Sequence, residues 1–218
     1  MDISPEELKA FQRATDNTEI QQLFGRYATL MDQMDAMGIY NELMAKDDPE
    51  VSVEYTCNGR YDGPEHVKIF FEDWHTKLND ISDKTGYFDV TDGVTPNVVI
   101  SDDGQYAYAT WSLFGPKAKL ASPYGCTDRQ LTAFWYGGKM YWELKKVDGY
   151  WKILHFQLAT YLSSPYDLGW VKQPECWRES PIWATLPDGE QRFYVYNPDR
   201  VYVKGSPYQY GPYVPTQL

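Results

Sequence analysis

The spacing of apolar residues changes once along the chain, and this change limits the possible folds more than any other feature. Between residues 20 and 34, apolar side chains recur every three or four residues, a spacing typical of an amphipathic helix. Beyond about residue 95 the spacing becomes two, which is typical of strands. Helices that precede a long run of strands predict an α+β fold, in which the helices pack on one face of a curved antiparallel sheet.

Local signals give the expected order of elements. Ser4 followed by Pro5 predicts a short first helix over "EELKAFQRA", and "TDNTEI" marks the start of a second helix that continues into "YATLMDQMD". The segment "VSVEYTCNGRYDG" contains Asn-Gly and predicts a small hairpin, and "GPEHVKIFFEDWHTKLND" predicts a further helix. Four strands are expected in "TPNVVIS", "QYAYATWSLFG", "RQLTAFWYGGKMYWELKKVDG" and "YWKILHFQLATYL", with turns at "SDDG" and "VDG".

Charge and cysteine content narrow the class of protein. A formal charge of −11 argues against nucleic acid and against anionic membrane surfaces, because both require clustered Lys and Arg. The acidic start "MDISPEELKAFQ" does not resemble a signal peptide, and no stretch approaches the ~20 apolar residues of a membrane span. Three widely separated cysteines indicate reduced thiols. A cytoplasmic protein is therefore expected.

The last part of the chain differs in composition from the rest. From Ser163 onward, Pro and Gly interrupt the pattern while Trp and Tyr keep it apolar, which is unusual for a solvated tail. We expect one domain over residues 1–162 and an extension over 163–218 that packs on its own domain or on a neighbouring subunit. The aromatic content of 17% suits a cavity for ring-shaped ligands, and a Tyr-rich surface or subunit contact would explain it equally well.

Several residues could carry chemistry. Tyr27 lies within the helical apolar stripe, so its hydroxyl either polarises a substrate oxygen or serves as a core phenol bonded to a backbone carbonyl. Trp111, Trp135 and Tyr55 lie at strand positions that could line a cavity, with core packing as the alternative. His66 and His75 are nine residues apart on a helix and therefore on opposite faces, and no cysteine or carboxylate cluster has metal-ligand spacing. We expect neither a metal nor an organic cofactor.

Five strings in this order resemble the SnoaL-like group of the nuclear-transport-factor-two superfamily. They cover about residues 17–161 and read "YATLMDQMD", "LMAKDDPEVSVEY", "GRYDGPEHVKIFF", "VVISDDGQYAYATW" and "GGKMYWELKKVDGYWKI". The resemblance implies a cone-shaped α+β barrel with an apolar pocket between sheet and helices. It also implies a choice of functions, because the family contains dehydratases, isomerases, polyketide cyclases, a formaldehyde-releasing lyase for lignin-derived diarylpropanes, and non-catalytic modules.

The resemblance also assigns residues. It places Asp32, rather than Asp35, at the position of a catalytic aspartate, although helical periodicity alone would expose Asp32. It points the strand face of Trp151 into the cone, which would place His155 and Gln157 along the cavity; a structural His155 is the alternative. Family dehydratases have a histidine near "GYFDVTDGVTPNVVIS", where this chain has none, and Asp92 is the nearest ionisable residue.

These assignments predict a cofactor-independent lyase for an aromatic two-ring or polycyclic alcohol, releasing water or formaldehyde. Tyr27 and His155 would handle the leaving oxygen, with Asp32 as base or as the group that orients a base. Two alternatives stay open: an isomerase or cyclase of a polycyclic ketone, and a non-catalytic binding or assembly module. A homodimer or homotrimer is expected.

Overall fold

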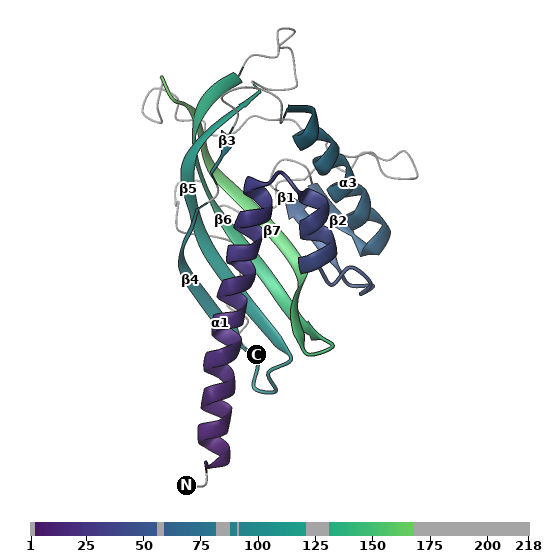
Figure 1. The fold of residues 1–218 in the computed structure, drawn as a ribbon, viewed down its shortest axis with the longest axis vertical. Coiled ribbons are helices and arrows are strands. Elements are labelled where there is room, and N and C mark those ends of the chain that lie inside the picture. Colours follow the sequence, from purple (N-terminus) through teal and green to yellow (C-terminus); the bar gives the residue numbers. More distant parts are fainter. Residues whose placement is uncertain (1–2, 56–58, 82–87, 91, 121–130, 168–218) are drawn as a thin grey trace.

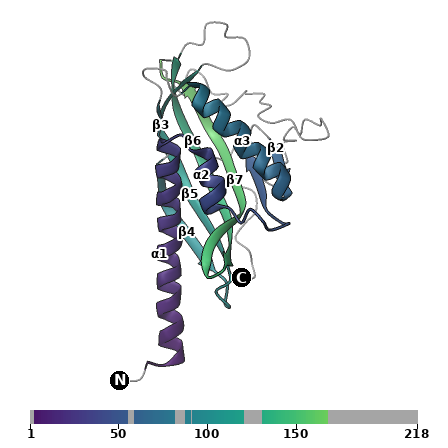
Figure 2. The ribbon, with the colours of Figure 1, turned by 45° about the vertical axis from the view of Figure 1, so that its right-hand side comes forward.

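Helices cover one face of a curved sheet, as the spacing of apolar residues predicts. A computed structural model of the chain describes residues 3–55, 59–81, 88–90, 92–120 and 131–167. The sheet bends around helix α1 (Pro5–Asp32), and helix α3 (Gly63–Ile81) lies beside it over the same face (Figure 1). The turned view shows the N-terminal part of α1 extending beyond the ends of the strands (Figure 2). We call the face of the sheet that α1 covers the inner face.

Helix α1 is one continuous helix, so the expected break at "TDNTEI" is wrong. It begins with a capping box, in which the Ser4 hydroxyl accepts from the Glu7 amide and the Glu7 carboxylate accepts from the Ser4 amide. Thr15 and Thr18, read from sequence as part of a second helix start, instead donate their hydroxyls to backbone carbonyls four residues earlier. Asp16 is buried against the sheet. The two threonines therefore bond within α1 and Asp16 contacts the sheet, and none of the three begins a new helix.

The end of α1 is a tight reversal. Met34 adopts a left-handed backbone with φ of 56°, the conformation that commonly follows a helix C-terminus. Asp35 then caps the short helix α2 (Ala36–Gly38), because its Oδ1 accepts from the Gly38 amide at 2.8 Å. The π-helix η1 (Ile39–Leu43) continues the chain toward the sheet. Asp35 is thus the residue that caps the turn after α1.

The remaining elements form a seven-stranded sheet of order β2-β1-β7-β6-β5-β3, in which β4 also pairs with β5. The strands are β1 (Ser52–Tyr55), β2 (Gly59–Asp62), β3 (Phe88–Asp89), β4 (Gly93–Ile100), β5 (Tyr106–Leu120), β6 (Leu131–Val147) and β7 (Tyr150–Pro165). Strands β5, β6 and β7 form the long antiparallel meander, whereas β1 pairs with β7 in parallel. Strand β7 continues past residue 162, where the sequence suggested a boundary, and most of the 163–218 extension lies outside the described residues. No helix in the described ranges is long and apolar enough to cross a membrane.

An irregularity in β7 decides which side chains face inward. Glu143 pairs with His155, but the next residue, Leu144, pairs with Ile153, so Leu154 is an extra residue in β7. Such a β-bulge reverses the alternation of side chains between the two faces of a strand. Trp151 and Ile153 precede the bulge and point to the inner face, and beyond it the inner positions belong to Phe156 and Leu158, both buried in the core.

A partly buried ion pair fixes the connection between η1 and β1 to the sheet. Lys145 on β6 donates to Asp48 Oδ2 at 2.7 Å, and the Glu50 amide donates to Asp48 Oδ1 at 2.9 Å. The hydrogen bond from Lys145, with that from the Glu50 amide, lowers the pKa of Asp48 from its ordinary value of 3.8. The folded state therefore binds the proton of Asp48 less readily than the unfolded chain does.

This pKa shift predicts a pH-dependent effect of the Asp48→Asn substitution. A carboxyl whose folded pKa is depressed stabilises the fold above its unfolded pKa, and this contribution disappears as the pH falls through the folded pKa. We expect Asp48→Asn to lower the free energy of unfolding at pH 7, and the two proteins to converge as the pH falls below 3.8. Urea unfolding from pH 7 down to pH 3 would measure this. A difference that stays constant over that range would contradict it.

Candidate active site in the aromatic interior

Aromatic rings from α1 and from the inner face of the sheet meet in one cluster. Phe24 on α1 stacks on Trp111 of β5, with ring centroids 4.5 Å apart and planes inclined by 21°. Trp142 on β6 contacts both rings, at 5.6 Å from Phe24 and 4.7 Å from Trp111. All three side chains are buried. Trp111 therefore faces the interior, as its strand position allowed.

Tyr27 brings a phenol into this cluster. It lies one turn beyond Phe24 on α1, and its ring is 5.6 Å from that of Trp142, edge to face at 82°. Its ring centroid is also 5.8 Å from that of Phe156 on β7. Only 1% of Tyr27 is exposed. The helical stripe thus predicted its inward direction correctly, and a phenol held among rings in a water-poor interior can donate a hydrogen bond to a substrate oxygen.

Strand β4 gives the cluster its close packing against α1. A Cβ atom at Gly93 would lie 2.1 Å from Cζ of Phe24, so only glycine leaves room for that ring. The strand is irregular here, with a register shift between Val94 and Asn97 and a left-handed Thr95 at φ of 53°. This segment is where family dehydratases have their histidine. In this chain it supports Phe24 through the backbone.

Two other predicted site residues, Asp32 and Asp92, do not join the cluster. Asp32 is the last residue of α1 and its side chain is exposed. Asp92 is also exposed, and its carbonyl accepts from the Phe114 amide at 3.4 Å. Tyr55 belongs to β1 and pairs with Leu158 of β7, but its side chain lies outside the part of the structure that is described.

The prediction that His155 and Gln157 line the cavity is wrong, because the bulge at Leu154 turns both to the outer face. On that face, His155 Nδ1 lies 2.8 Å from Ser52 Oγ, and His155 Nε2 lies 3.4 Å from Glu143 Oε2. The sequence contains a signal for this reversal. Ile153 and Leu154 are adjacent apolar residues between polar Lys152 and His155, so the period of two already fails there.

A serine, a histidine and a carboxylate, the residue types of a nucleophilic triad, lie together here as Ser52, His155 and Glu143. Unlike the serine of a triad, however, Ser52 is not accessible to a substrate. Ser52 is only 4% exposed, and its backbone lies in the ladder between β2 and β7, where Ser52 pairs with Asp62 and His155. A substrate carbonyl must reach the serine oxygen and find donors for an oxyanion beside it. The outer-face His155 is therefore a structural histidine, the alternative that the sequence left open.

Trp135 also lies on the outer face, which corrects its predicted place beside Trp111. It pairs with Pro116, and strand alternation puts it on the face opposite Tyr136 and Trp142. Its ring stacks on Phe114 at 5.8 Å and on Tyr166 at 6.0 Å. Along β6 the polar Lys139, Glu143 and Lys145 occupy odd positions, as Trp135 does, whereas the buried Tyr136 and Trp142 occupy even ones.

The same alternation identifies interior residues that sequence analysis missed. Along β6 the even positions carry Tyr136, Met140, Trp142 and Leu144, all buried. Trp142 is the central member of the ring cluster and was not a candidate. Phe156 was assigned to the outward face, because the bulge in β7 was not recognised.

The described residues contain no group of three or more His, Cys, Asp or Glu side chains that could hold a metal ion. The polar atoms that the cluster offers belong to a phenol and to indoles, which donate hydrogen bonds and are poor metal ligands. These groups can pack against flat apolar rings and donate hydrogen bonds to a ligand oxygen, and the phenol can also pass a proton to it.

Comparison with known families agrees with this architecture. The family model described as "SnoaL-like domain" matches residues 12–157, which include most of α1 and most of the sheet. The chain belongs to the SnoaL-like domain family. This family lies within the nuclear-transport-factor-two-like superfamily, as the resemblance implied. A search of curated proteins finds no match.

Solved structures with the same fold include proteins named for elimination reactions. LinA aligns with a TM-score of 0.53 at 12% identity, over 72% of this chain and 93% of LinA. The hexachlorocyclohexane dehydrochlorinase LinA-type3 of Novosphingobium barchaimii aligns with a TM-score of 0.51 at 12% identity, over 72% and 93%. A scytalone dehydratase-like protein of Novosphingobium aromaticivorans aligns with a TM-score of 0.50 at 14% identity, over 72% and 91%. At these identities the likeness establishes the fold.

Proposed function

We propose that this SnoaL-like protein is a cofactor-independent lyase that eliminates water or formaldehyde from an aromatic two-ring or polycyclic alcohol. The observation that carries the proposal is Tyr27, a phenol only 1% exposed among the rings of Phe24, Trp142 and Phe156. Rings of the substrate would pack against these rings, and the Tyr27 hydroxyl would donate to its leaving oxygen. Elimination is also the reaction for which the dehydrochlorinase and dehydratase-like neighbours are named.

A phenolic substrate makes such an elimination possible without a cofactor. A base removes the phenolic proton, the benzylic carbon–oxygen bond breaks, and the departing hydroxide takes a proton from Tyr27 to give water and a quinone methide. If a neighbouring carbon carries a hydroxymethyl group, loss of its O–H proton and cleavage of the carbon–carbon bond release formaldehyde. The electron pair of that bond restores the aromatic ring, so no oxidant or reductant is needed.

Asp32 is the base in this proposal, and His155 has no part in it. Asp32 closes α1 five residues beyond Tyr27 and has the position that the family resemblance gives to a catalytic aspartate. Its exposed side chain favours a second candidate function, a non-catalytic module that binds an aromatic small molecule. In that case the interior would bind the ligand, and no base would need to reach it.

One assay separates these functions. Protein treated with a chelator is incubated with phenolic diaryl diols and polycyclic alcohols, and the products are weighed by mass spectrometry while binding is followed by calorimetry. We expect a product lighter by one water, or lighter by one water and one formaldehyde where the substrate carries the neighbouring hydroxymethyl group. Binding without conversion would favour the binding module, and a product of unchanged mass would favour an isomerase or cyclase. Neither binding nor conversion of any compound would contradict the proposed function.

A further inference from the structure

The indole of Trp142 has a buried N–H group without a hydrogen-bond partner. Trp142 is 0% exposed, and its Nε1 finds no acceptor among the residues that the structure describes. An unpaired buried donor costs a folded protein about 1–3 kcal/mol, and a phenylalanine would fill much of the same space without this cost. The indole of Trp151 shows the usual arrangement, since its Nε1 donates to Asp16 Oδ1 at 3.1 Å.

The surroundings of Trp142 define what could accept this hydrogen bond. Phe24 and Phe156, which contact its ring, have no polar side-chain atom, and the indole of Trp111 can only donate. A buried water usually makes about three hydrogen bonds, and among the described rings that contact Trp142 only that of Tyr27 carries an oxygen that could accept one. A ligand oxygen suits the position better, because the ligand brings apolar rings that pack on the same side chains.

We propose that Trp142 Nε1 donates a hydrogen bond to an acceptor oxygen of a two-ring aromatic ligand, and that this donor selects ligands with a carbonyl oxygen between the rings. The inference rests on the proposed function, because it takes the ligand to be the two-ring aromatic compound of that function. Tyr27 contacts the indole edge to face, so phenol and indole N–H come from α1 and β6 to the same interior. Tyr27 serves the leaving oxygen, and Trp142 is a positioning and specificity-determining residue.

A matched pair of ligands tests this donor. 4-Hydroxybenzophenone and 4-benzylphenol have the same two rings and the same phenol, and they differ only in a carbonyl in place of a methylene. We expect the wild-type protein to bind the ketone about tenfold to a hundredfold more tightly, which corresponds to one buried hydrogen bond. Trp142→Phe should lose this preference, whereas Trp111→Phe, the same change in a neighbouring ring, should weaken both ligands equally and keep the preference.

Two measurements keep the test decisive if Trp142→Phe folds poorly. Replacement of Trp142 by 3-benzothienylalanine keeps the bicyclic ring and removes the N–H, and it should abolish the preference for the ketone. In protein with 15N-labelled indoles, the resonance that disappears from this variant should move downfield with 4-hydroxybenzophenone and stay in place with 4-benzylphenol. If the variant still prefers the ketone, or if the indole resonance does not move while the ketone binds, the inference is wrong but the proposed function is unaffected. If neither ligand binds, both the inference and the proposed function fail.

Discussion

Tyr27→Phe should reduce turnover of the aromatic alcohol by about a hundredfold to a thousandfold, the usual effect of removing one positioned donor or acid from a water-poor site. The substitution removes a single oxygen from a side chain that is 1% exposed, and the ring contacts with Phe24, Trp142 and Phe156 can persist. Substrate binding should therefore change much less than kcat. Single-turnover assays with product mass analysis, together with calorimetric binding, would measure both quantities.

A second buried phenol provides the matched control. Tyr40 on η1 is buried against Phe71, and its burial raises the pKa of its hydroxyl above the ordinary value. Tyr40→Phe removes the same atom elsewhere in the core and should leave turnover unchanged. Equal loss of activity in both variants would indicate a general effect on folding. Full activity of Tyr27→Phe with an intact fold would remove the catalytic role of this phenol.

The extent to which the sequence predicted this interior depended on the regularity of each element. Tyr27 and Trp111 were placed correctly because α1 keeps its helical period and β5 pairs with β6 without a break over its whole length. His155 was misplaced because one extra residue, Leu154, reverses the faces of β7. Strict alternation assigns each residue beyond a bulge to the wrong face of the strand. The correct faces follow only if the adjacent apolar residues Ile153 and Leu154 are recognised as a bulge.

The position of a polar residue is harder to predict from sequence than that of an apolar one, because the same polar residue type can cap a helix, lie in a turn or make a buried contact. Asp16 lies in "TDNTEI", a string that favours a helix start, and only the folded chain shows that its carboxylate contacts β6 and β7. Trp142 has the opposite difficulty. Its place in the core follows from alternation, but the absence of an acceptor for its N–H among the described residues depends on every neighbouring side chain.

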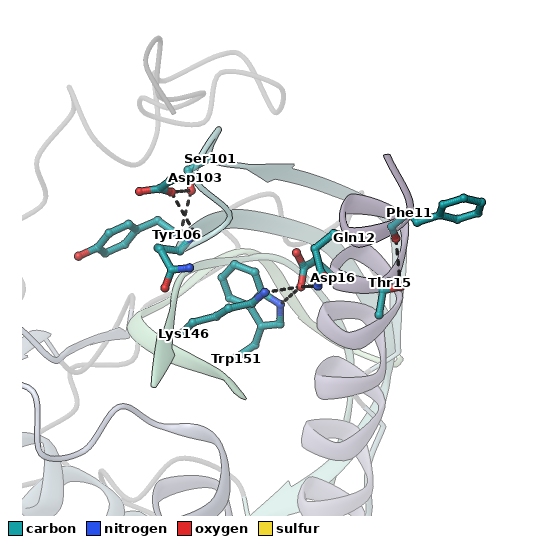
Figure 3. Close-up of polar contacts among 10 residues, drawn as sticks. Phe11, Gln12, Thr15, Asp16, Ser101, Asp103, Tyr106, Lys146 and Trp151 are labelled. Atoms are coloured by element: carbon teal, nitrogen blue, oxygen red, sulfur yellow. Dashed lines mark hydrogen bonds and ion pairs between the residues drawn. The ribbon is translucent and has the colours of Figure 1, made fainter. Parts of the chain in front are cut away.

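Asp16→Ala should lower the free energy of unfolding by about 3–5 kcal/mol, because it removes one partner from a buried ion pair. Asp16 Oδ1 lies 2.6 Å from Lys146 Nζ and accepts from Trp151 Nε1, and only 1% of Asp16 is exposed (Figure 3). Without the carboxylate, the largely buried ammonium of Lys146 and the indole N–H of Trp151 both lose their acceptor. Urea unfolding at pH 7 would measure the loss.

Asp102→Ala is the matched control, because Asp102 also links the N-terminal half of α1 to the sheet. Its Oδ1 accepts from Arg13 at 2.6 Å, but 80% of its side chain is exposed, so solvent competes for the pair. We expect no measurable change in unfolding there. Combining Asp16→Ala with Lys146→Met should recover part of the lost stability, since the double variant leaves no buried charge without a partner. If Asp16→Ala and Asp102→Ala destabilise the protein equally, burial is not what makes the Asp16 contact strong.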